Sequence, residues 1–127
     1  IGDLPHAWVG AEFLCSVRAF FIYEDDSTLH IGAGIPLTWL NYNRSISVKN
    51  IPTYYGKISY QIYKSGNCLK FIMHGGQEIK HFAVVVHSPE ENPIKDVNVQ
   101  GAQVQRVDGK AVTLKPQSTI IVLRLYY

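Results

Sequence analysis

The chain has 127 residues, which is enough for one domain with a packed core. With 46% hydrophobic and 17% charged residues, its composition is typical of a globular protein and excludes an intrinsically disordered chain. The net charge is only +2 and the Lys and Arg residues are scattered, which argues against a nucleic-acid-binding surface, because such a surface needs clustered basic side chains.

The first segment, residues 4–23, has apolar residues at the spacing of an amphipathic helix. Pro5 suits the first turn of such a helix, and Asp3 suits its N-terminal cap. The acidic run at residues 24–26 is expected to form the turn that ends the helix. The apolar surface is very wide, which indicates two packing partners, of which only the following β domain is evident in this chain. An isolated chain is therefore expected to cover the second face by dimerising.

From residue 28 onward, short apolar or alternating segments are separated by turn signals, a pattern typical of β-strands. KSGN at residues 64–67 and DG at residues 108–109 predict hairpin turns. Residues 35–40 and 88–93 are expected to be connections, the first with one helical turn. The predicted strands are residues 28–33, 45–49, 54–63, 68–74, 78–87, 96–100, 102–107, 110–114 and 119–126. The sequence thus predicts a mainly β protein, an antiparallel β-sandwich of about eight or nine strands with one N-terminal α-helix.

Motifs for metal, cofactor or nucleophilic chemistry are missing from the sequence. The four histidines after residue 27 lie on different predicted elements, and no pair has a metal-ligand spacing such as HxxxH, so neither a metal nor a cofactor is expected. GxSxG, GxGxxG and GxxxxGK[ST] are also missing. Cys15 and Cys68 are expected to be buried or free thiols, with one disulfide bridge as the less favoured alternative. No segment has the length and hydrophobicity of a membrane span.

Aromatic side chains next to polar ones are the best candidates for recognition, because aromatic faces pack well on the C–H surfaces of sugars. The candidates for carbohydrate contact are His6, Trp8, Glu12, Trp39, Tyr54 and Tyr55. The first three are expected near the start of the helix, where a ring and a carboxylate can line a sugar cleft. The others can form a stacking platform. Packing inside the protein, strand propensity or an ordinary surface position can also explain each of these six side chains without any ligand.

Three motifs occur in order along the first half of the chain: PHAW at residues 5–8 with Glu12 following, LHIGAGIPLTW at residues 29–39, and IPTYYGKISY at residues 51–60. Together they resemble the C-terminal part of bacterial glycosidase-like proteins with a six-hairpin α/α toroid. In those chains a PH-x-W-x-x-(A/S)-E helix is the last helix of the toroid. An acidic turn, an (A/G)-A-G-(I/V)-P segment and a P-T-x-(Y/F)-G strand follow it. From residue 77 on, no motif of this family is found.

The resemblance implies that residues 1–26 are the terminal helix of an upstream toroid and residues 27–127 a β-sandwich domain. It implies a non-catalytic module of a larger carbohydrate-active, glycoside hydrolase-like protein, which packs on the toroid of the same polypeptide and stabilises it. His6 and Trp8 would then lie near the sugar cleft of the larger protein. The general acid and base would lie upstream, so no catalytic residue is assigned to this chain. The resemblance also implies a periplasmic or secreted location, which is usual for this family.

Two other functions remain open on the sequence. The first is a carbohydrate-binding module that binds an oligo- or polysaccharide through exposed aromatic side chains. The second is an immunoglobulin-like interaction domain, suggested by the order Cys15, Trp39, Cys68. The second fits less well, because Cys15 lies on a predicted helix and not on a strand.

Overall fold

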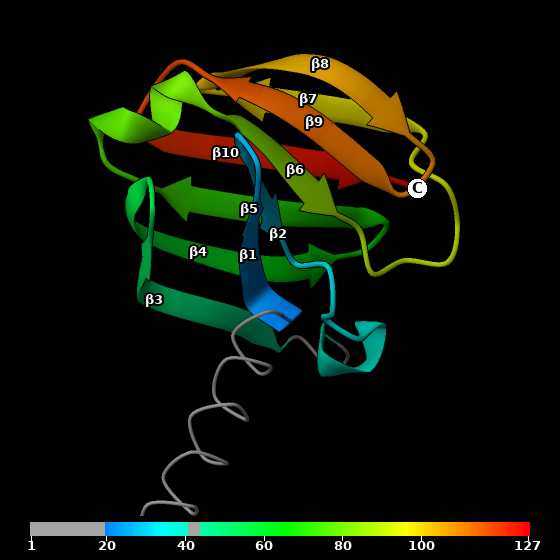
Figure 1. The fold of residues 1–127 in the computed structure, drawn as a ribbon. Coiled ribbons are helices and arrows are strands. Elements are labelled where there is room, and N and C mark those ends of the chain that lie inside the picture. Colours follow the sequence, from blue (N-terminus) through cyan, green and yellow to red (C-terminus); the bar gives the residue numbers. More distant parts are fainter. Residues whose placement is uncertain (1–19, 41–43) are drawn as a thin grey trace, which may run out of the picture.

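The structure, a computed structural model, describes residues 20–40 and 44–127. These residues form two five-stranded sheets that pack face to face as a β-sandwich (Figure 1). The predicted mainly β, sandwich-like architecture is confirmed, with ten strands in the described part where eight or nine were expected. The predicted N-terminal helix falls almost entirely outside the described residues.

Sheet A has the strand order β1-β2-β6-β9-β8. Its strands are β1 (Ile22–Asp25), β2 (Thr28–Ile31), β6 (Ala83–His87), β9 (Ala111–Pro116) and β8 (Ala102–Asp108). β2 and β6 pair in parallel, whereas the other neighbours in this sheet are antiparallel. The parallel pair was not expected, because the sequence predicted a purely antiparallel sandwich.

Sheet B has the strand order β3-β4-β5-β10-β7, with antiparallel pairing throughout. Its strands are β3 (Ser45–Thr53), β4 (Gly56–Ser65), β5 (Cys68–His74), β10 (Ile120–Tyr126) and β7 (Asp96–Gln100). Two short 3₁₀ helices, η1 (Leu37–Leu40) and η2 (Gln77–His81), complete the described elements. η1 is the single helical turn that the sequence predicted in residues 35–40.

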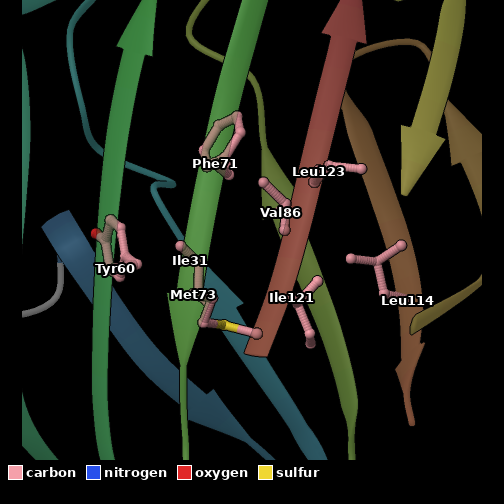
Figure 2. Close-up of a pocket in the computed structure, with 8 residues that line it drawn as sticks. All are labelled: Ile31, Tyr60, Phe71, Met73, Val86, Leu114, Ile121 and Leu123. Atoms are coloured by element: carbon pink, nitrogen blue, oxygen red, sulfur yellow. The ribbon is translucent and has the colours of Figure 1, made fainter. Parts of the chain in front are cut away.

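The core lies between the two sheets and follows the two-residue period of the strands. On β4, Ile58, Tyr60 and Ile62 point inward and are buried, as the alternation predicted. Between the sheets there is a gap of about 10 Å³ (Figure 2). Its lining is Ile31, Tyr60, Phe71, Met73, Val86, Leu114, Ile121 and Leu123. One water molecule needs at least about this much space and polar partners as well, so the interior is a packed apolar core and not a ligand pocket.

The predicted end of the N-terminal helix is wrong. Helical backbone stops at Phe21, and β1 begins at Ile22, which pairs with Ile31 of β2. The acidic residues at positions 24 and 25 belong to this strand, and the turn comes after them, with Asp26 in the left-handed region at φ 52°. Pairing with β2 and full burial of Ile22 override the helical spacing of the apolar residues, so sheet A includes residues before position 27.

The predicted strand over residues 78–87 is only half correct. Its first part is the 3₁₀ helix η2, and β6 starts at Ala83. Ile79 is buried as the apolar anchor of η2, and the Phe82 amide donates to its carbonyl at 3.3 Å. Apolar residues at positions 79 and 82 fit one helical turn, a spacing that overlaps with the strand pattern that follows.

Candidate functional site

Tyr54 and Tyr55 lie in the turn between β3 and β4, where the sequence predicted the start of a strand. Thr53 Oγ1 accepts a hydrogen bond from the Tyr55 amide at 3.0 Å and donates to the Gly56 carbonyl at 2.7 Å. The two neighbouring rings lie in very different environments. Tyr54 is 89% exposed, whereas Tyr55 is only 5% exposed.

Tyr55 is part of the packing between the two sheets. Its hydroxyl donates to the Asp26 carbonyl at 2.6 Å, and its ring lies 3.5 Å from the Phe82 ring between centroids. Burial raises the pKa of Tyr55, and the charges of Glu24 and Asp26 add to this effect. Tyr55 is therefore not available to a ligand in this structure, which removes it from the predicted stacking platform.

Trp39 belongs to an aromatic patch, which we define as Phe20, Phe21 and Trp39. Trp39 is 44% and Phe20 49% exposed, and the rings of Phe21 and Trp39 lie 6.0 Å apart. The Gly34 amide donates to the Phe20 carbonyl at 3.0 Å, and a Cβ at Gly34 would lie within 3.0 Å of the Phe20 backbone. Gly34 thus holds the patch close to the start of sheet A.

The structure does not bring the predicted aromatic candidates together. Trp39 lies in η1, before the start of β3, and Tyr54 follows the end of β3 at Thr53. β3 has nine residues, which span about 30 Å in extended conformation. Trp39 and Tyr54 therefore cannot share one sugar. The remaining candidates, His6, Trp8 and Glu12, lie outside the described residues.

Two histidines that seemed unrelated in the sequence meet on the outer face of sheet A. His30 of β2 and His87 of β6 are connected by a hydrogen bond of 2.9 Å between Nδ1 of His30 and Nε2 of His87. Tyr23, the cross-strand partner of His30, stacks on the His30 ring with 4.4 Å between centroids and 3° between planes. One imidazole donates and the other accepts, so the pair needs at least one neutral ring.

Both imidazoles are poor proton acceptors in the folded state. Burial lowers the pKa of His30, and the carboxylate of Asp25 opposes this effect. Burial also lowers the pKa of His87, and the charge of His30 lowers it further. Below about pH 6.5 the unfolded chain binds protons at these histidines that the folded chain does not bind.

We therefore expect the protein to lose stability as the pH falls from about 7.5 to about 5. Urea unfolding at both pH values measures the difference in unfolding free energy. In the variant His87→Gln this difference should become smaller, because one of the two histidines is gone. His81→Gln, at an exposed position on η2, serves as the control. An equal pH dependence in His87→Gln and the unchanged protein would show that the lowered pKa of His87 does not cause the loss of stability.

The β4–β5 turn, the β6–β7 loop and the C-terminus meet at one end of the sandwich (Figure 1). Residues of these segments line a polar cleft. Its volume is about 430 Å³. The lining residues are Lys64, Gly66, Asn67, Glu90, Asn92, Pro93, Lys95 and Tyr127. Its size falls within the range of small-molecule sites. The sequence predicted only a turn and a loop in these segments.

Glu90 is the carboxylate side chain among the residues that line the polar cleft. It is buried, and its Oε1 atom lies 2.7 Å from Nζ of Lys64. The Glu90 amide donates to Ser88 Oγ at 3.2 Å, and Ser88 Oγ is hydrogen-bonded to the Tyr127 hydroxyl. Burial raises the pKa of Tyr127 to about 12, although the hydrogen bond with Ser88 opposes this shift. The phenol is therefore neutral at physiological pH and can both donate and accept hydrogen bonds.

Within residues 20–40 and 44–127, no three His, Cys, Asp or Glu side chains gather closely enough to hold a metal ion. Cys68 is a free, half-buried thiol. The same residues include no helix with the length and apolar character of a membrane span.

Comparison of the chain with known protein families, with curated proteins and with solved structures finds no match. The features of the described residues that bear on function are the aromatic patch, the histidine pair and the polar cleft.

Proposed function

We propose that this chain is a non-catalytic β-sandwich accessory module of a larger, glycoside hydrolase-like protein. In this proposal the sandwich packs on a neighbouring toroid domain of the same polypeptide and stabilises it. The family resemblance of the three motifs suggests the toroid, and the aromatic patch supplies the packing surface. A periplasmic or secreted location is part of the same proposal.

The aromatic patch is the observation that carries the proposal. Phe20 and Trp39 are large rings that remain about half exposed, while Ile22, one residue beyond the patch, is fully buried. Covering the exposed half of one such ring removes roughly 100 Å² from water, which stabilises a contact by about 2 kcal/mol. The patch adjoins residue 20, the point where the segment that resembles a toroid helix joins the sandwich.

The size of the native protein is the first test. An antibody against this chain should detect a species several times heavier than 14.3 kDa in the source organism. A native species of 14.3 kDa would contradict the proposal. In that case a second copy of the chain would be the partner that covers the patch, which size-exclusion chromatography would show.

The substitution Trp39→Ala tests the patch itself. In the heavier native protein we expect it to lower the unfolding free energy of the sandwich by about 2 kcal/mol more than it does in the 127-residue chain, because only the larger protein covers the ring. Chemical denaturation of both forms measures this difference. Tyr54→Ala, an exposed aromatic residue at the other end of β3, is the matched control. Equal effects of Trp39→Ala in both forms would refute packing through this patch.

A carbohydrate-binding module is the second candidate. The polar cleft favours it, because hydrogen-bonding side chains gather there around a buried carboxylate. Tyr54 contributes little to this alternative, since Tyr55 is buried and Trp39 lies at the far end of β3. The two candidates do not exclude each other, because the patch and the cleft are formed by different residues.

A further inference from the structure

We propose that the polar cleft binds a terminal neutral sugar unit through two adjacent hydroxyl groups, with Lys64, Glu90 and Asn92 as the main contacts. That the cleft is a binding site follows from its geometry alone. The choice of a saccharide over another polyol rests on the proposed function.

The cleft presents hydrogen-bond donors and acceptors next to each other. Lys64 has three N–H donors, of which one points to Glu90, and Glu90 has a second carboxylate oxygen besides the one paired with Lys64. The amide groups of Asn67 and Asn92, which also line the cleft, each supply both a donor and an acceptor. A sugar hydroxyl donates and accepts at once, so two adjacent hydroxyls match a lysine beside a carboxylate.

The charges in the cleft favour a neutral ligand. An anion such as phosphate would meet the buried carboxylate of Glu90, and a cation would meet the ammonium group of Lys64. The ion pair offsets the charges of Lys64 and Glu90, and Lys95, the other charged residue that lines the cleft, is exposed to solvent, which screens its charge. The polar atoms of the pair remain able to form hydrogen bonds. A polyol encounters neither repulsion.

The central side chains of the cleft are already held in position. Glu90 is fixed by Lys64, and its backbone is fixed by Ser88, which in turn is bound to the Tyr127 hydroxyl. Asn67 Nδ2 contacts the Tyr127 carbonyl at 3.5 Å, which connects the β4–β5 turn to the same unit. Preorganisation reduces the entropy that a ligand has to overcome, so a small ligand can bind without ordering the loop.

The lining also offers apolar surface. The ring of Tyr127 is half-buried at one side of the cleft, and Pro93 contributes a second nonpolar wall. Small-molecule sites combine such surfaces with a few polar groups that fix the orientation of the ligand. The C–H face of a sugar ring suits the aromatic wall while its hydroxyls face Glu90.

The test is an array of immobilised neutral mono- and oligosaccharides, followed by calorimetric titration of this chain with the best-binding sugar. Asn92→Ala and Glu90→Gln are each expected to weaken binding about tenfold or more. The first removes the side-chain amide, and the second replaces one carboxylate acceptor with an NH₂ donor and abolishes the ion pair with Lys64. Asn98→Ala, at an exposed position on β7, is the matched control and should leave the affinity unchanged. Asn92 is exposed, so its variant is expected to keep the melting temperature and to report binding alone.

Two results would overturn the inference: no sugar on the array binds, or binding is the same in Asn92→Ala and Glu90→Gln as in the unchanged chain. Either result leaves the packing proposal intact, because that proposal depends on Trp39 in the larger native protein. Conversely, sugar binding by a native protein of only 14.3 kDa would keep this inference and refute the accessory-module proposal.

Discussion

Gly101→Ala is expected to lower the free energy of unfolding by about 3 kcal/mol or more. Gly101 joins β7 of sheet B to β8 of sheet A, with φ +85°, a conformation that L-residues rarely adopt. A Cβ at this position would lie well inside 3.0 Å of the Ile120 carbonyl oxygen, a separation that real Cβ atoms essentially never show. Backbone strain and the clash each cost roughly 1–3 kcal/mol.

The neighbourhood of Gly101 leaves no easy way to relieve the clash. Its carbonyl accepts hydrogen bonds from the amides of Gln117 and Ser118 at 2.9 and 3.0 Å. Any shift of Gly101 away from Ile120 would disturb these bonds and the start of β10. The substitution should therefore destabilise the connection between the two sheets and not only the turn.

Urea unfolding of Gly101→Ala and Gly109→Ala measures this effect against a matched control. Gly109 also has a positive φ of +49°, but a Cβ there would meet no atom within 4 Å. Gly109→Ala should therefore cost only the backbone strain, about 1 kcal/mol. Equal losses in the two variants would show that the close approach of Gly101 to Ile120 contributes nothing.

The strands could be predicted wherever burial follows the two-residue period. Ile58, Tyr60 and Ile62 of β4 face the core, and the turn signal at residues 64–67 separates β4 from β5 as expected. The failures occur where two periods overlap. The position of Ile22 fits both a continuation of the predicted N-terminal helix and the start of a strand. Its pairing with Ile31 is what makes it the start of β1.

The LHIGAGIPLTW motif contains one glycine whose role follows from the local backbone and one whose role depends on a contact with a distant residue. The sequence predicted a strand over residues 28–33, and β2 ends two residues earlier, at Ile31. Gly32 follows with φ +77°, which explains a glycine at this position. The reason for Gly34 is different, because it lies against Phe20, and no local signal reveals that contact.

The histidine pair and the polar cleft could not be predicted, because both depend on contacts between distant segments. His30 and His87 are 57 residues apart and meet only because β2 and β6 pair in parallel. Glu90 lies in a loop that the sequence did predict, but its burial depends on Lys64 and Tyr127 from two other segments. A charged residue in a proline-rich loop normally indicates a solvated surface, so the sequence pointed away from this site.

Leu123→Ala is expected to lower the free energy of unfolding by about 2–5 kcal/mol, the usual cost of this truncation in a packed core. Leu123 lies on β10, an interior strand of sheet B between β5 and β7, and is 1% exposed. It points into the space between the sheets beside Ile121 and Phe71 (Figure 2). The alanine would enlarge the existing small gap, and the strands on both sides are held by hydrogen bonds and cannot close it.

Val122→Ala is the matched control, because Val122 is the preceding residue of the same strand and points to the outer face of sheet B. Its truncation should cost clearly less, since a half-buried side chain leaves no closed cavity. A domain of this size has roughly 5–15 kcal/mol of stability, so Leu123→Ala removes a large share of it. Similar losses in the two variants would mean that the two sheets do not pack as a closed sandwich around β10. The polar cleft, which depends on β4, β6 and the end of β10 being held in place, would then lose its rigid support as well.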